Sequence, residues 1–219
     1  MNATEFSALL VLATATSFTP GPNTTLSTAL AANHGLARAL RFVCAVPVGW
    51  ALLLVLCTAG VGALVMAQPL LRWGILAGGC TYLLWLAARL WRSHALAQAD
   101  PRRLQVGFGQ GVLLQFLNIK AWMLALSIVA GWIAGRDDTW TRFAQVLPVM
   151  LAYAFASNLA YALTGSLLRE WLAGPVVDGR PSHRRLRYFN RAMALALLFT
   201  AAWMLVHGLA PAPAAPDHP

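Results

Sequence analysis

The chain has 219 residues, of which 59% are hydrophobic and only 11% are charged. Soluble domains carry about 25% charged residues and disordered chains are poor in apolar ones, so this composition argues against both classes of protein. The formal net charge of +9 comes from 15 Arg and one Lys against 7 acidic residues. In a soluble protein such an excess would suggest a nucleic-acid partner, so the positions of the arginines decide how it is interpreted.

Charged residues divide the chain into six apolar stretches. A bilayer core of about 30 Å needs roughly 20 mostly apolar helical residues to cross it. The stretches predict an all-α polytopic membrane protein with transmembrane helices near 5–30, 42–66, 72–91, 110–134, 143–168 and 191–210. They form a single membrane domain over 1–210, and the proline-rich segment 211–219 is expected to be a disordered C-terminal tail.

The arginines are unevenly shared between the connections that join these helices. Twelve lie in the first, third and fifth connections, and three lie in the second and fourth. Cytoplasmic loops carry the excess of Lys and Arg, so the split predicts a bacterial inner-membrane protein with both termini in the periplasm. A nucleic-acid surface would need the arginines on one soluble domain, whereas here they alternate with apolar spans. The expected surroundings are therefore a lipid bilayer, with no nucleic-acid partner.

The first span is interrupted near its middle by Pro20, Gly21 and Pro22. Two prolines and a glycine disrupt helical hydrogen bonding, and backbone freed in this way must face protein or a water-filled cavity. Residues after Pro22 can begin a second half-helix, whose N-terminal N–H groups attract a carboxylate. Asn23 and Thr24 add short polar side chains there. These five residues are predicted to bind substrate; a simple kink is the alternative.

The fourth span contains Lys120, the only Lys or Arg that lies away from the ends of a predicted span. A lysine at a helix centre costs roughly 2.5–3.5 kcal/mol on insertion scales and usually faces a cavity or a partner. Together with Asn118, it is predicted to meet an anionic substrate group or to take part in proton coupling. The alternative is a snorkelling lysine, or an interfacial one if the helix begins near 117. Asn158 and Tyr161 share a face of the fifth span and would either complete the cavity or bond neighbouring helices.

The two interruptions fall in the first helix of each three-helix half. Because three is an odd number, the halves have opposite orientation in the membrane. The sequence therefore predicts two inverted three-helix repeats, each opening with an interrupted helix, which is the plan of secondary transporters.

Residues for other chemistry are missing from the pattern. The five His are scattered, the three Cys lack ligand or redox spacing, and no nucleotide-binding Gly-Lys-Ser/Thr loop occurs. We therefore expect no metal, cofactor or catalytic residue, and we disfavour a membrane-embedded enzyme. A non-transporting structural or assembly subunit is the remaining alternative.

The element Pro20-Gly21-Pro22-Asn23, with Gly35 and the arginines of the first loop, resembles the signature of the LysE/RhtB amino-acid exporter family. Segments 79–92 and 107–120 resemble its third and fourth helices, so the resemblance spans essentially the whole chain. It implies a six-helix inner-membrane exporter of amino acids or close derivatives, a secondary active transporter driven by proton exchange. Such a protein is not an enzyme. Monomer and homodimer are both compatible with the sequence.

Two positions depart from the family pattern. Ile119 stands where members usually have Pro between Asn and Lys, which leaves open whether the fourth helix is sharply broken. Trp50 follows Gly49 where many members carry an acid. All seven acids lie in tails or loops, so the sequence places no carboxylate at mid-membrane to carry a proton: Glu5, Asp100, Asp137, Asp138, Glu170, Asp178 and Asp217.

Overall fold

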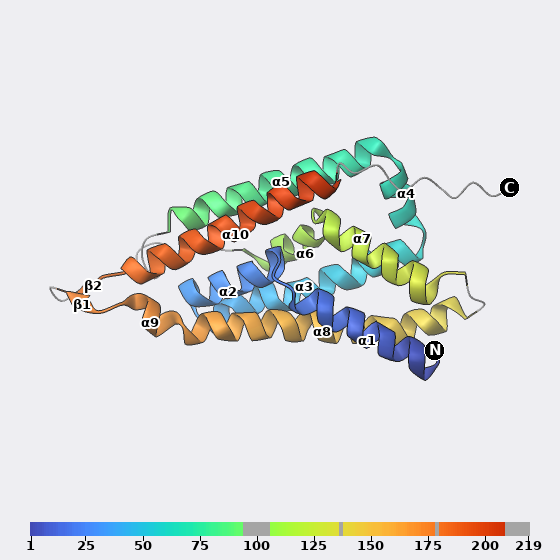
Figure 1. Cartoon of the computed structure of the whole chain (residues 1–219), viewed down its shortest axis with the longest axis horizontal. Helices are drawn as coiled ribbons and strands as arrows, with labels where there is room; N and C mark the ends of the chain where they lie inside the picture. Colours follow the sequence, from blue (N-terminus) through green and yellow to red (C-terminus); the bar gives the residue numbers. More distant parts are fainter. Residues whose placement is uncertain (94–105, 136–137, 178–179, 209–219) are drawn as a thin grey trace.

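Helices dominate the computed structural model, which describes residues 1–93, 106–135, 138–177 and 180–208 (Figure 1). A hairpin of two-residue strands, β1 (Val176–Val177) and β2 (Arg180–Pro181), interrupts the helical pattern. The tail predicted over 211–219 lies outside the described residues. The helices are α1 (Ala3–Phe18), α2 (Pro22–His34), α3 (Leu36–Thr58), α4 (Val61–Ala67), α5 (Pro69–Trp91), α6 (Phe108–Phe116), α7 (Ile119–Ile128), the π-helical turn η1 (Val129–Ile133), α8 (Thr139–Leu167), α9 (Arg169–Ala173) and α10 (Arg184–Gly208).

The helices support a multi-pass membrane protein. Within the described residues α3, α5, α8 and α10 are long and apolar enough to cross a membrane, and α6 with α7 and η1 makes a fifth candidate, bent by 68°. The predicted first span corresponds to two helices, the 16-residue α1 and the 13-residue α2. At 1.5 Å per residue α2 is only about 20 Å long, too short to span alone.

The boundaries of two helices differ from those of the predicted spans, which were taken to end at charged residues. The helix predicted near 42–66 begins at Leu36, includes Arg38 and Arg41, and ends at Thr58. The left-handed Gly60 (φ 85°) then separates it from α4. The helix predicted near 191–210 begins at Arg184. Apolar runs report the part of a helix that lies in lipid, whereas arginine side chains allow the helix to continue beyond it.

The core brings α2 against α8, α3 against α8 and α6, and α5 against α10. These helices approach closely because small residues stand at the crossings. A Cβ on Gly165 of α8 would overlap the carbonyl oxygen of Thr28 in α2, and one on Gly49 of α3 would overlap the side chain of Gln115 in α6. Small residues at such crossings are typical of helix packing in membranes.

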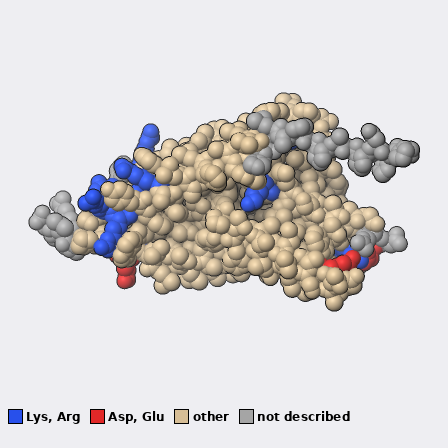
Figure 2. Space-filling model, viewed as in Figure 1, with Lys and Arg blue, Asp and Glu red and all other residues tan. Residues whose placement is uncertain are grey.

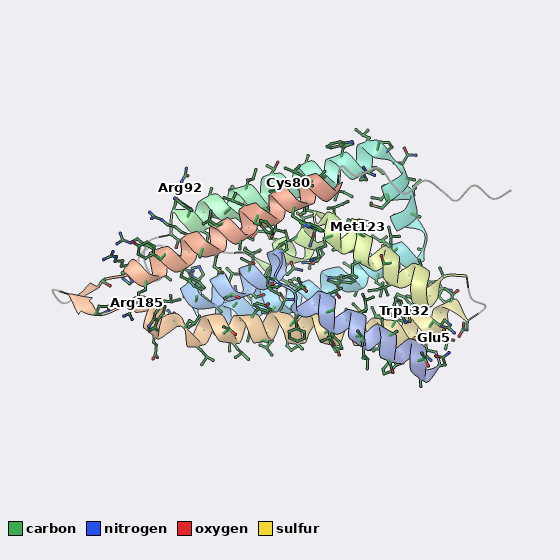
Figure 3. The ribbon with its side chains drawn as sticks, in the orientation of Figure 1. Glu5, Cys80, Arg92, Met123, Trp132 and Arg185 are labelled. Carbon is green, nitrogen blue, oxygen red and sulfur yellow. The ribbon has the colours of Figure 1, made fainter. Side chains whose placement is uncertain are left out.

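Basic side chains gather at one end of the molecule, where α5 ends and α10 begins (Figures 2 and 3). The chain begins at the opposite end, toward which α10 also runs (Figure 1). Arg142, an exception to the arginine pattern, lies there and is only 9% exposed. It pairs with Asp138 at 2.9 Å and Glu5 at 3.3 Å, and Trp132 donates to the main chain of Glu5 at 2.8 Å. Its position is therefore explained by pairing.

Candidate functional site

A cavity of about 80 Å³ lies where the break between α1 and α2 meets the break between α6 and α7. Helices α3 and α8 supply the rest of its wall. Seven of the nine predicted site residues line it: Gly21, Pro22, Asn23, Thr24, Asn118, Lys120 and Asn158. Pro20 and Tyr161 do not. The Tyr161 hydroxyl instead donates to the carbonyl of Phe18 at 2.9 Å, so it holds the end of α1 in place.

The first break presents the N-terminus of α2 to the cavity. Gly21 is the N-cap and Pro22, which has no N–H, is the first helical residue. The hydroxyl of Thr24 accepts the N–H of Gly21 at 2.9 Å, and the N–H of Thr25 donates to Gly21 O at 2.9 Å. The N–H groups of Asn23 and Thr24 belong to the first turn, where a helix offers no acceptor, so the positive end of α2 faces the cavity.

The second break is sharp although Ile119 replaces the expected proline. Asn118 is extended (φ −99°, ψ 96°) and separates α6 from α7. Trp122 Nε1 donates to the carbonyl of Phe116 at 2.9 Å, which satisfies an acceptor freed at the end of α6. A Cβ on Gly79 of α5 would overlap the carbonyl oxygen of Leu117, so glycine makes room for the displaced backbone. Tertiary contacts therefore keep this break open.

Lys120 lies in the first turn of α7 and is half-buried. Its Nζ is 5.7 Å from the ring centroid of Trp203 in α10, within the range of a cation–π contact. It is the one ionisable side chain among the described residues that line the cavity. A lysine and two helix N-termini give the cavity a positive electrostatic character. Figure 2 also shows a basic side chain, drawn in blue, midway along the face in view and away from the arginine-rich end.

Gln115 is a site residue that sequence reasoning did not single out. It is fully buried, and its amide pairs reciprocally with Asn23: Asn23 Nδ2 donates at 2.8 Å and Gln115 Nε2 donates back at 3.1 Å. This pair joins the first break to α6. The sequence feature that could have indicated Gln115 is its position as an amide side chain within an apolar run, three residues before Asn118. Trp50, one of the two departures noted in the sequence, lies on the cavity wall and is 8% exposed.

A sequence model of LysE type translocators matches residues 14–208. The chain belongs to this family. The expectation of an amino-acid exporter that is not an enzyme is thereby confirmed at the level of the family.

Several curated relatives of this translocator carry the name cysteine/O-acetylserine efflux protein. The one from Klebsiella pneumoniae is 31% identical over 78% of this chain and 86% of its own length. The Salmonella typhimurium protein is 26% identical over 85% and 90%, and the Escherichia coli protein 24% over 92% and 97%. No solved structure matches the chain significantly.

The described acids of this translocator lie outside its cavity. Glu5 and Asp138 pair with Arg142 near the N-terminal end, and Glu170 is exposed in α9. The described residues that line the cavity therefore include no carboxylate, at Trp50 or elsewhere. Among the described lining residues, Lys120 is the one whose side chain can change its charge.

Proposed function

We propose that the chain is a secondary active transporter that exports a small zwitterionic amino acid, of the cysteine and O-acetylserine kind, in exchange for protons. The observation that carries the proposal is the cavity between two helix breaks with Lys120 on its wall. Secondary transporters bind substrate at such discontinuous helices.

The first break suits a zwitterion because it offers two helix ends of opposite polarity. Thr16 and Ser17, in the last turn of α1, line the same cavity as the first turn of α2. The C-terminal end of a helix carries partial negative charge and the N-terminal end partial positive charge. The substrate carboxylate would bind the N–H groups of Asn23 and Thr24, with its ammonium group directed away from them.

The volume supports a small substrate. A cavity of about 80 Å³ has room for roughly six water-sized spheres at about 10–15 Å³ each. We expect a compact amino acid such as cysteine to fit that space better than an aromatic amino acid. Trp50 and Met150 supply bulky apolar wall, which we expect the substrate side chain to contact.

Orientation in the membrane follows from the arginine-rich end. We place that end in the cytoplasm of a bacterium and both termini in the periplasm, with the bilayer covering the exposed apolar side chains. Counting α1–α2 and α6–α7–η1 as two broken spans gives six spans in two inverted halves. The cavity then lies between the first helices of the two halves, which is where inverted-repeat transporters bind their substrates.

Proton exchange assigns a specific role to Lys120. An exchanger requires substrate and proton to exclude one another, so the substrate must favour the neutral form of the titrating group. The ammonium group of a zwitterion enclosed beside Lys120 repels the charged amine, and this repulsion favours the neutral form of Lys120. A carboxylate paired with charged Lys120 would instead carry the proton outward with the substrate. We therefore assign the carboxylate to α2 and the proton to Lys120.

The experiment is counterflow and pH-driven uptake of labelled cysteine or O-acetylserine in proteoliposomes. Wild-type protein should exchange one of them and respond to an imposed pH gradient. Lys120→Met, fixed neutral, should retain counterflow but lose the response to the gradient. Lys120→Arg, fixed positive, should lose at least about tenfold in apparent affinity through repulsion of the ammonium group.

Arg92→Met provides the matched control because it removes the same charge from an exposed position at the arginine-rich end (Figure 3). It should stay within about twofold of wild type. Wild-type protein that moves no amino acid or analogue would overturn the export proposal. Retained affinity in Lys120→Arg together with lost affinity in Lys120→Met would overturn the proton assignment, because that pattern indicates carboxylate pairing.

A further inference from the structure

A buried polar cluster joins three helices at the arginine-rich end of the molecule. Asn33 lies near the end of α2, Asn190 in the second turn of α10, and Ser93 directly after α5. Asn33 Nδ2 donates to Asn190 Oδ1 at 2.8 Å, and Asn190 Nδ2 donates back to Asn33 Oδ1 at 3.0 Å. Asn190 Nδ2 also donates to the carbonyl of Ser93 at 3.2 Å, and the Ser93 hydroxyl donates to Asn33 Oδ1 at 3.4 Å. We call these three residues the amide cluster.

The amide cluster connects two groups of helices that share little other surface. Helix α5 packs chiefly on α10, and α2 packs chiefly on α8 and α3, whereas α10 meets α2 over a much smaller area. Figure 1 shows α5 and α10 side by side, above α2. Both amide side chains of the cluster are at most 1% exposed, so the contact between the two groups is closed at this end.

The α5–α10 pair also reaches the second helix break. Gly79 of α5 makes room for the carbonyl of Leu117, and Trp203 of α10 lies beside Lys120 Nζ. The cavity lies at the N-terminal end of α2 and the amide cluster near its C-terminal end, about 15 Å away at 1.5 Å per residue. A movement of the pair relative to α2 would therefore affect the cluster and the surroundings of Lys120 together.

The amide cluster lies between the cavity and the cytoplasm in the orientation proposed above. An exporter receives its substrate from the cytoplasm, so helices at that end have to separate before the substrate can enter. Polar groups suit a contact that opens repeatedly, because water replaces their hydrogen bonds when they separate and the net cost is modest. The crossing of α2 and α8 is of a different kind, since Gly165 against the backbone of Thr28 would lose close packing.

We propose that Asn33, Ser93 and Asn190 form a cytoplasmic latch, which holds the α5–α10 pair against α2 and opens to admit the substrate. The inference rests on the proposed export function and orientation, and it adds the place at which the cytoplasmic entrance opens. The structure then represents the state in which this entrance is closed. Opening exchanges the hydrogen bonds of the amide cluster for hydrogen bonds with cytoplasmic water.

A reversible cross-link across the latch tests whether it has to open. Asn33→Cys with Asn190→Cys, in a background whose three native cysteines are replaced by alanine, is joined by a short bis-methanethiosulfonate reagent. Transport is measured as counterflow of labelled O-acetylserine, which has no thiol and leaves the cross-link intact. Cross-linking should lower counterflow at least about tenfold, because the substrate has to reach the cavity from both sides, and dithiothreitol should restore it.

The matched control is a cross-link within the α5–α10 pair. Cys80 Sγ of α5 donates to the carbonyl of Ala201 in α10 at 3.6 Å, so Ala201→Cys beside the native Cys80 can be bridged by the same reagent. This variant should stay within about twofold of its uncross-linked rate, because the two helices move together. Full counterflow with the latch cross-linked, or equal losses in the two variants, would overturn the inference while leaving export intact.

Thiol labelling detects the same opening in a variant that does not transport. Asn33→Cys as the sole cysteine should react with a membrane-impermeant maleimide, added to the cytoplasmic face of inside-out vesicles, although Asn33 is 1% exposed in the closed state. Ala162→Cys is fully buried in α8, which stays packed on α2, and should react at least about tenfold more slowly. Equal rates would overturn the latch. Failure of wild-type protein to exchange O-acetylserine or any other amino acid would instead remove the proposed function.

Discussion

The reciprocal amide pair of Asn23 and Gln115 leads to a quantitative prediction about the first helix break. Its two hydrogen bonds, of 2.8 and 3.1 Å, connect α2 to α6 and fix the side chain that follows Pro22. Removing Gln115 as Gln115→Leu leaves both polar atoms of Asn23 without these partners. Interhelical hydrogen bonds in membrane proteins contribute about 0.6 kcal/mol on average and up to about 1.7 kcal/mol. Two of them, with Gln115 fully buried, should give a coupling energy of about 1–2 kcal/mol.

The assay is a double-mutant cycle of Asn23→Leu and Gln115→Leu, read as the free energy of unfolding by SDS in mixed micelles. Gln110 provides the matched control. It lies on the same helix, is exposed, and accepts the N–H of Gly107 at 2.8 Å. A cycle of Asn23→Leu with Gln110→Leu should show coupling within about 0.5 kcal/mol of zero, as for independent sites. Equal coupling in the two cycles would refute the pairing on which the geometry of the first break depends.

Two further predictions concern the second break and the N-terminal end. Gly79→Val should abolish counterflow and destabilise the protein by about 1–3 kcal/mol, because its side chain overlaps the carbonyl of Leu117. Gly74→Val on the same helix, where a Cβ meets nothing within 4 Å, should be nearly neutral, and equal losses would contradict this account. The hydrogen bond from Arg142 holds the pKa of Asp138 below its ordinary value of 3.8. A carboxyl group whose pKa is lower in the folded state stabilises the fold at pH values above its unfolded-state pKa. Asp138→Asn should therefore lower the melting temperature at neutral pH, and the melting temperatures of variant and wild type should converge as the pH falls below about 4.

The sequence was informative wherever one residue carries a cost that lipid does not tolerate. Proline and glycine at 20–22 predicted the first break, and Lys120 predicted the second cavity-facing segment; both segments line one cavity. Such residues signal their role locally, because an unpaired backbone group or a charge in lipid needs compensation wherever it lies. The starts of α3 and α10 were misplaced for a different physical reason, since their arginines continue a helix beyond the apolar run.

The partners inside the site were beyond the reach of sequence reasoning. Gln115 and Asn23 are 92 positions apart, and their pairing exists only because α3 and α6 pack closely through Gly49. For Tyr161 the sequence left open a cavity position or a bond between helices, and its hydroxyl makes the second, to the end of α1. A helical period assigns a face to each residue, but which neighbour covers that face is decided by tertiary packing.

The two breaks differ in what maintains them, and this difference suggests a division of roles. Pro20 and Pro22 have no N–H to donate, so a continuous helix through α1 and α2 would lack two of its hydrogen bonds, and straightening the first break is costly. The second break contains no proline and depends on the bond from Trp122 and the space at Gly79. Contacts of that kind are side-chain and packing contacts, which cost less to rearrange than backbone hydrogen bonds that prolines remove. The fixed break thus suits the carboxylate that all zwitterionic substrates share. The second break carries Lys120, to which we assign the exchanged proton, and it is therefore the half in which we propose that proton exchange is coupled to movement.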